Sequence, residues 1–239
     1  MAVGGIWRSA YPVTTSIKQK ERVWEDMKII DLSHEIRGGM QVVPGDPEPA
    51  VERHLIHEKD GCHVDRLVLG THTGTHVDVP YHWLPDGKTL DQVYLARFIG
   101  RGVVVDVRRL PANASIGPAH LKAVLDGIVP GIFVLFHTGW DRYFGTDTYM
   151  DHPYLEAETI ALLVDRQVGL VGIDAMSIDA SRGSVFPAHD QFLGRDILIV
   201  ENLCHLDQVC DVSGFFSFLP LKVAGTDGSP IRAVYMEME

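Results

Sequence analysis

Apolar residues gather in short runs along the chain, with glycine, proline and polar residues between them. Runs rich in Val, Ile, Leu and Phe are typical of β-strands. Two of them, FVLF at 133–136 and ILIV at 197–200, are apolar at every position, which predicts strands that are buried on both faces. The strands that we expect lie within residues 28–32, 63–69, 102–108, 131–139, 168–174, 196–203, 216–225 and 233–237.

Two segments show helical patterns instead. Residues 118–127 begin with Pro118, which suits a first helical turn, and residues 155–167 place acidic residues early and Arg166 late. The longest irregular piece that we expect is the loop 141–153. Many strands with few helices predict an α/β or α+β fold in which sheet predominates.

The length of 239 residues suits one domain with its own core. Residues 1–26 are polar and without pattern, so we interpret them as an N-terminal extension or arm, followed by one folded domain over 27–239. The chain has neither a basic start with an apolar run behind it nor an apolar stretch long enough to span a bilayer.

The charge and the cysteines narrow the function classes. A formal net charge of −11 argues against a nucleic acid or an anionic membrane surface as partner, and favours a small-molecule substrate. The three cysteines, Cys62, Cys204 and Cys210, are an odd number without CxxC spacing, so we expect neither a disulfide framework nor a thiolate zinc site. A reducing cytoplasm is the location that we predict.

The stretch GTHTGTHVDVPYH, at 70–82, contains four side chains that can bind a metal or carry a proton. His72, His76, Asp78 and His82 all stand at even positions, so in a strand they would share one face. In a straight strand, however, His72 and His76 would lie roughly 13 Å apart, and His72 and His82 roughly 33 Å apart. A metal–nitrogen bond is only about 2 Å long, so one ion could not bind all of these histidines in a straight strand.

The same stretch carries residues that suit a bend. Gly70 and Gly74 tolerate unusual φ values, and Pro80 cannot extend a strand ladder. We therefore predict that the chain folds into a cup, with His72, His76 and Asp78 around a common centre and with His82 at the rim.

Imidazole and carboxylate ligands suit Zn²⁺ or Mn²⁺, and three of them leave a coordination position open for water. Such a site predicts hydrolysis: a metal-bound hydroxide would attack a carbonyl while His82, free of the metal, carries the proton.

The motif resembles a known family. Residues 72–82 match the HxGTHxDxPxH signature of the cyclase family of metal-dependent hydrolases, which includes bacterial kynurenine formamidases and isatin hydrolases. The resemblance continues from about residue 29 to the C-terminus. It includes DLSHEI at 31–36, VPGDP at 43–47, HTGWD at 137–141, GIDAMSID at 172–179 and the pair His189 and Glu201.

This resemblance implies a swivelling β/β/α fold, assembled as a homodimer or homotetramer, with one or two divalent ions per subunit. By the same resemblance His72, His76 and Asp78 bind the first metal, and Asp78 bridges to a second metal held by His189 and Glu201. His82 would be the catalytic proton donor and acceptor. Glu201 directly follows an apolar strand, where a carboxylate needs a cation to offset its desolvation.

The predicted substrate site departs from the family in one position. Kynurenine formamidases typically place a tryptophan before the PGD turn, where it stacks on the aromatic substrate, but this chain has Val43. Trp83, Phe186 or Phe215 could supply a different stacking wall.

The leading hypothesis is therefore an arylformamidase-like hydrolase of a non-peptide C–N bond in an aryl formamide, another amide or a lactam. The alternatives are a metal-dependent cyclase or lyase that acts on a carbonyl substrate, and a metal-binding protein without catalysis. A serine hydrolase is disfavoured because the sequence contains no GxSxG.

Overall fold

The computed structural model of the protein describes residues 28–209 and 214–237. The predicted extension at 1–26 and Cys210 lie outside the described residues. Within the described ranges, none of the helices combines the length and the apolar character that a membrane crossing needs.

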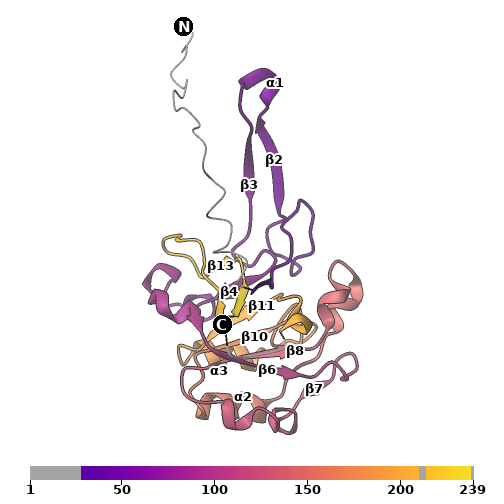
Figure 1. Ribbon diagram of the computed structural model, residues 1–239, viewed down its shortest axis with the longest axis vertical. Helices are drawn as coiled ribbons and strands as arrows, with labels where there is room; N and C mark the ends of the chain where they lie inside the picture. The colour runs from indigo at the N-terminus through magenta and orange to yellow at the C-terminus, as the bar shows by residue number, and fades with distance from the viewer. Residues whose placement is uncertain (1–27, 210–213, 238–239) are drawn as a thin grey trace, which may run out of the picture.

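A six-stranded sheet forms the centre of the molecule (Figure 1). Its last four strands run parallel to one another, whereas β4 is antiparallel to both of its neighbours. The order across this sheet is β13 (Gly228–Pro230), β4 (His76–Asp78), β11 (Leu198–Glu201), β10 (Leu170–Ile173), β8 (Phe133–His137) and β6 (Gly102–Asp106).

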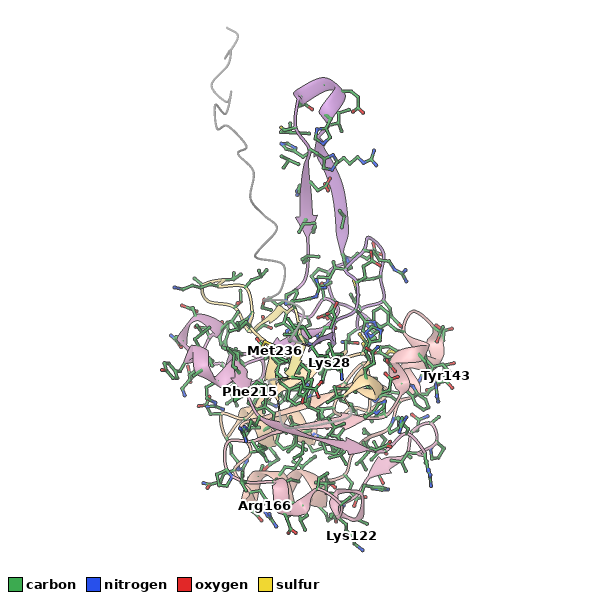
Figure 2. All side chains as sticks on the ribbon, viewed as in Figure 1. Lys28, Lys122, Tyr143, Arg166, Phe215 and Met236 are labelled. Atoms are coloured by element: carbon green, nitrogen blue, oxygen red, sulfur yellow. The ribbon has the colours of Figure 1, made fainter. Side chains whose placement is uncertain are left out.

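A second, four-stranded sheet is antiparallel throughout. Its order is β1 (Lys28–Asp31), β14 (Val234–Glu237), β12 (Phe215–Ser217) and β5 (Ile99–Gly100). Figure 2 labels Lys28, Phe215 and Met236, which lie close together on this sheet. The described residues also form two further pairs of strands: β2 (Ala50–Leu55) with β3 (Val64–Val68), and β7 (Ser115–Ile116) with β9 (Tyr154–Leu155).

The three α-helices are α1 (His57–Asp60), α2 (Ala157–Asp165) and α3 (Pro187–Leu193), counted within the described ranges. Strand β8 shows how the layers are built. Val134 and Phe136 join one buried apolar cluster with residues of α2 and α3, whereas Phe133 and Leu135 join another with residues of the four-stranded sheet. Alternation along the strand thus places helices on one face of the central sheet and the second sheet on the other. The fold is a single β/β/α domain dominated by sheet, as predicted.

The apolar runs at 133–136 and 197–200 are buried at every position, which confirms strands covered on both faces. The predicted helix at 155–167 is confirmed as α2. The strand predicted at 216–225 is too long. Strand β12 ends at Ser217, and within the rest of this segment only Pro220 forms a β-bridge, to Ile231.

The predicted helix at 118–127 is wrong. The segment forms two short 3₁₀ turns, Pro118–Leu121 and Leu125–Gly127, closed by hydrogen bonds between residues three apart. Val124 lies between them with φ −116° and ψ 1°, outside the helical region. A β-branched residue and a glycine near the end both lower helix propensity, so the segment does not extend beyond single turns. The loop 141–153 likewise contains 3₁₀ turns, Trp140–Tyr143 and Asp147–Asp151.

Strands β2 and β3 form a hairpin with α1 at its tip, and this arm projects away from the body (Figure 1). Every residue from 50 to 68 is exposed or half-buried. The side chains of the arm extend into open space beyond the body (Figure 2), and they include Val51, Val64 and Leu67, which is 60% exposed.

Candidate metal centre

The segment from Gly70 to His82 bends on both sides of strand β4. Before the strand, a turn contains Gly74 with φ +63°, a conformation that favours glycine. After it, Pro80 begins a 3₁₀ turn that ends at His82. The bend predicted at Gly74 and Pro80 is therefore present, and the row of even-numbered residues does not form one straight strand.

The bend brings the histidines together. The ring centroids of His72 and His76 lie 4.9 Å apart, and those of His72 and His82 lie 4.1 Å apart. A straight strand would have separated these pairs by roughly 13 Å and 33 Å.

Asp78 lies at the centre of this cluster and is fully buried. Its Oδ1 is 2.8 Å from His72 Nδ1 and 3.4 Å from His76 Nε2. Its Oδ2 is 3.8 Å from His189 Nε2. One carboxylate thus faces three imidazoles from two different parts of the chain.

Glu201, the last residue of β11, faces the same group from the neighbouring strand. Its Oε2 is 3.6 Å from His76 Nε2, and its Oε1 is 3.6 Å from His189 Nε2. Oε1 also accepts hydrogen bonds from Ser177 Oγ and from the backbone N–H of Ile178. These bonds fix the carboxylate in one orientation at the end of a buried strand.

Two of the imidazoles are held so that Nε2 faces the carboxylates. His76 Nδ1 donates to the carbonyl oxygen of Gly74 at 2.7 Å, and His189 Nδ1 donates to Asp179 Oδ2 at 2.8 Å. Asp179 also accepts the backbone N–H groups of Ala188 and His189, which fixes the first turn of α3. In its neutral form, a ring that donates through Nδ1 carries its lone pair on Nε2, the arrangement that a metal ligand needs.

The cluster carries more acid than its neutral imidazoles can balance. Burial disfavours a charge on His72, but Asp78 and Asp227 outweigh burial and raise its pKa to about 11. Burial likewise opposes a charge on His189, yet Asp179, Glu201 and Asp78 raise its pKa to about 9. Such a negative field favours any cation that reaches it.

The residues fit a divalent metal by two further observations. Both oxygens of Asp78 are buried and, among the described residues, neither accepts a hydrogen bond. Two ligands of one tetrahedral ion at bond lengths near 2.1 Å lie roughly 3.4 Å apart, close to the separations around Asp78 and Glu201. The described donor atoms form two groups within 4.8 Å that share Asp78: His72, Asp78 and His82, and His76, Asp78 and Glu201.

A cavity of about 230 Å³ opens onto the cluster. Trp83 and Phe186 line it, with ring centroids 5.7 Å apart and nearly perpendicular planes, and Trp83 also lies 5.5 Å from the ring of His189. Val43 lines the same cavity and is 40% exposed. The pocket therefore joins a polar, acidic side with an apolar, partly aromatic side.

The structure thus brings together all the predicted site residues, namely His72, His76, Asp78, His82, His189, Glu201 and Val43. Phe215 does not belong with them, because it lies in β12 near Arg101. Cys204 is a free thiol that lies buried among the core residues.

Sequence reasoning missed two carboxylates that contact the histidines, Asp179 and Asp227. Asp179 stands in the quoted segment GIDAMSID, which could have drawn attention to it. Asp227 stands in an Asp-Gly pair, which reads as an ordinary turn.

Comparisons with known proteins identify the family of the chain. The family described as "Putative cyclase" matches residues 30–180. A kynurenine formamidase from Erythrobacter litoralis is 32% identical over 225 residues, which cover 94% of this chain and 98% of the relative.

Solved structures show the same fold. An isatin hydrolase bound to the product analogue thioisatinate has a TM-score of 0.84 at 21% identity, covering 91% of this chain and 95% of that one. A protein described as a potential metal-dependent hydrolase with cyclase activity has a TM-score of 0.70 at 30% identity, covering 89% and 99%.

The family match spans most of the chain, and the similarity to the formamidase spans nearly all of it. The resemblance inferred from the histidine motif is confirmed: this chain belongs to the cyclase family and is a metal-dependent hydrolase.

Proposed function

We propose that this protein hydrolyses the C–N bond of a non-peptide amide: an aryl formamide, another amide or a lactam. The observation that carries the proposal is the pocket itself, in which a carboxylate–imidazole cluster faces two aromatic side chains, Trp83 and Phe186. The similarity to a kynurenine formamidase supports an aryl formamide as one substrate class.

One or two divalent ions, Zn²⁺ or Mn²⁺, occupy the cluster in this proposal. The first would be held by His72, His76 and Asp78, and a second by Asp78 with His189 and Glu201. Bound there, a divalent metal supplies Lewis acidity that acidifies water and polarises the carbonyl oxygen.

The side chains around the cluster transfer the proton and bind the substrate. His82, which is 27% exposed at the edge of the cluster, takes a proton from the attacking water as its oxygen bonds to the carbonyl carbon. The same proton passes to the leaving nitrogen as the C–N bond breaks, which yields a carboxylic acid and an amine. Trp83 and Phe186 form an apolar wall for the substrate and exclude water from that side.

The proposal is tested by an activity screen of the purified protein with measured metal content. N-formyl aryl amines, isatins and cyclic amides are the candidate substrates, and released formate or ring-opened acid is the readout. Turnover that depends on a divalent metal and releases an amine supports the proposal. A metal-loaded protein that cleaves none of these C–N bonds contradicts it.

We also propose a homodimer or homotetramer, and the β2–β3 arm supports this. A two-stranded hairpin alone is marginally stable in water, and this one exposes Val51, Val64 and Leu67. Packing against a second copy would bury these side chains. We also propose a reducing, cytoplasmic location, which the free thiols of Cys62 and Cys204 support.

The first prediction concerns metal binding. Asp78→Ala and His76→Ala should abolish metal content and activity, because each removes a ligand that faces the other buried donors. The control is His137→Ala, which removes an equally buried histidine that pairs with Asp174 outside the cluster. Metal analysis after dialysis measures the outcome, and full occupancy in Asp78→Ala would exclude its bridging role.

The second prediction separates proton transfer from metal binding at His82. His82→Ala should retain most of its metal but lose roughly a hundredfold in turnover, the usual scale for general acid–base catalysis. His63→Ala is the matched control, because His63 also pairs with an aspartate, at 3.0 Å, but lies on the arm. Metal loss as complete as in His76→Ala would instead make His82 a ligand.

The third prediction concerns the aromatic wall. Val43→Trp should lower KM for an aryl formamide by roughly threefold to tenfold, since an aromatic pair contributes about 0.5–1.5 kcal/mol beyond area burial. Val129→Trp is the control, because Val129 is also exposed but does not line the cavity. An unchanged or higher KM in Val43→Trp would show that Trp83 and Phe186 already meet the aromatic group.

The fourth prediction concerns assembly through the arm. Leu67→Asp should shift the protein toward monomers in sedimentation velocity, because it places a charge among the apolar side chains of the arm. Leu95→Asp, at a comparably exposed leucine on another part of the surface, should leave the assembly unchanged. A wild-type protein that sediments as a monomer would refute the proposal.

A further inference from the structure

Asp227 lies beside strand β4, directly before the short strand β13. Its carbonyl oxygen accepts a hydrogen bond from Val79 N at 3.1 Å, and the next residue, Gly228, pairs with Asp78 across the two strands. A Cβ on Gly228 would lie 2.7 Å from the carbonyl oxygen of Val77 and 3.1 Å from His72 Cε1. Only glycine allows this close approach, which brings the Asp227 carboxylate within reach of the histidines.

One oxygen of Asp227 contacts two imidazoles. Oδ2 lies 2.9 Å from His72 Nε2 and 3.1 Å from His82 Nδ1. Both distances are within hydrogen-bond range, and an aspartate with its ordinary pKa is ionised at neutral pH. A carboxylate can only accept, and each ring must therefore donate through the nitrogen that faces it.

These bonds select one tautomer for each neutral ring. A metal would replace the His72 proton on Nδ1, the atom that faces Asp78 Oδ1 at 2.8 Å, while the proton on Nε2 stays in its hydrogen bond to Asp227. His82 carries its proton on Nδ1, which leaves the lone pair on Nε2. The two neighbouring rings thus present opposite nitrogens for bonding, unlike His76 and His189, which both donate through Nδ1.

We infer that Asp227 is a positioning residue shared by His72 and His82, which sets the tautomer and the orientation of both rings. Through one ring it prepares Nδ1 of His72 for the metal cluster, and through the other it prepares Nε2 of His82 to accept a proton. The part that concerns His82 rests on the proposed function, whereas the part that concerns His72 does not. Asp227 itself touches neither substrate nor metal in this arrangement.

The magnitude follows from comparable sites. Loss of an outer carboxylate that holds a metal-binding histidine typically costs 10-fold to 100-fold in metal affinity or in activity. Because Asp227 holds two histidines with different roles, both quantities should change in one variant.

The test is the Asp227→Ala protein, compared with wild type and with Asp227→Asn. In long-range ¹⁵N–¹H spectra of the Zn²⁺-loaded protein, assigned with single-histidine variants, His82 should lose its single-tautomer signature. The dissociation constant for Zn²⁺, measured by chelator competition, should rise 10-fold to 100-fold. At saturating metal, kcat for an amide substrate should fall more than KM changes. Asp227→Asn keeps a neutral acceptor of the same shape, so it should restore part of each effect.

Asp65→Asn and Asp65→Ala are the matched controls. Asp65 pairs with His63 at 3.0 Å and its side chain is 36% exposed, against 32% for Asp227. Both controls should leave metal affinity and the signals of His82 unchanged.

An unchanged His82 tautomer and unchanged Zn²⁺ affinity in Asp227→Ala would overturn the inference. If circular dichroism shows that Asp227→Ala is unfolded, Asp227→Asn decides with the same spectra and competition assay, since its neutral acceptor should shift both only partly. Neither readout needs a substrate, so an absence of amide hydrolysis would refute the proposed function and leave this inference standing. Intact hydrolysis with unchanged spectra and affinity would refute the inference alone.

Discussion

The buried carboxylate of Asp78 is the constraint on which the site depends. Both of its oxygens are buried, and no described residue gives them a hydrogen bond. An ionised carboxylate in that position is costly unless a cation compensates it. The surrounding elements supply the means: His76 from the same strand, Glu201 from β11 and His189 from α3 all face the point where a cation would lie.

The position of β4 in the central sheet makes this convergence possible. Strand β4 pairs with β11 on one side and with β13 on the other, so a carboxylate lies on each side of it: Glu201 at the end of β11, and Asp227 directly before β13. Strands β8, β10 and β11 are buried at every position, and their parallel pairing holds the ends of β10 and β11 in a fixed register. The stiffness of the core therefore sets the distances between the donor atoms, which is what catalysis by preorganised groups requires.

Much of the fold could be predicted from local patterns. Continuous apolar runs predicted the central strands, because burial on both faces leaves little room for polar residues. The helix predicted at 118–127 was wrong because its apolar residues fit a helix or packed turns equally well. The carbonyl oxygens of Gly117 and Val124 accept hydrogen bonds from residues three positions later, which close turns instead of a helix. Strand β2 was missed because its sequence, AVERHL, has no buried face to leave an apolar pattern.

The candidate site, like the fold, could be predicted from the sequence only in part. One short stretch contains His72, His76, Asp78 and His82. Their spacing and the bending residues between them could therefore be recognised in the sequence. The roles of Asp179 and Asp227 depend on hydrogen bonds between segments that are far apart in the chain, and no local pattern marks such pairs. A single sequence therefore reveals the donors of a metal site more readily than the groups that orient them.

The pocket has two sides with different structural support. The polar side is built from strand ends and from the first turn of a helix, where backbone pairing fixes each donor. The apolar side comes from residues outside the strands: Val43 in a turn, Trp83 directly after a 3₁₀ turn and Phe186 directly before α3. A change on this apolar side leaves the strand pairing intact, so the substrate preference can change while the metal chemistry stays the same. Such a division explains physically how the side chain at position 43 can vary without disturbing the cluster around Asp78.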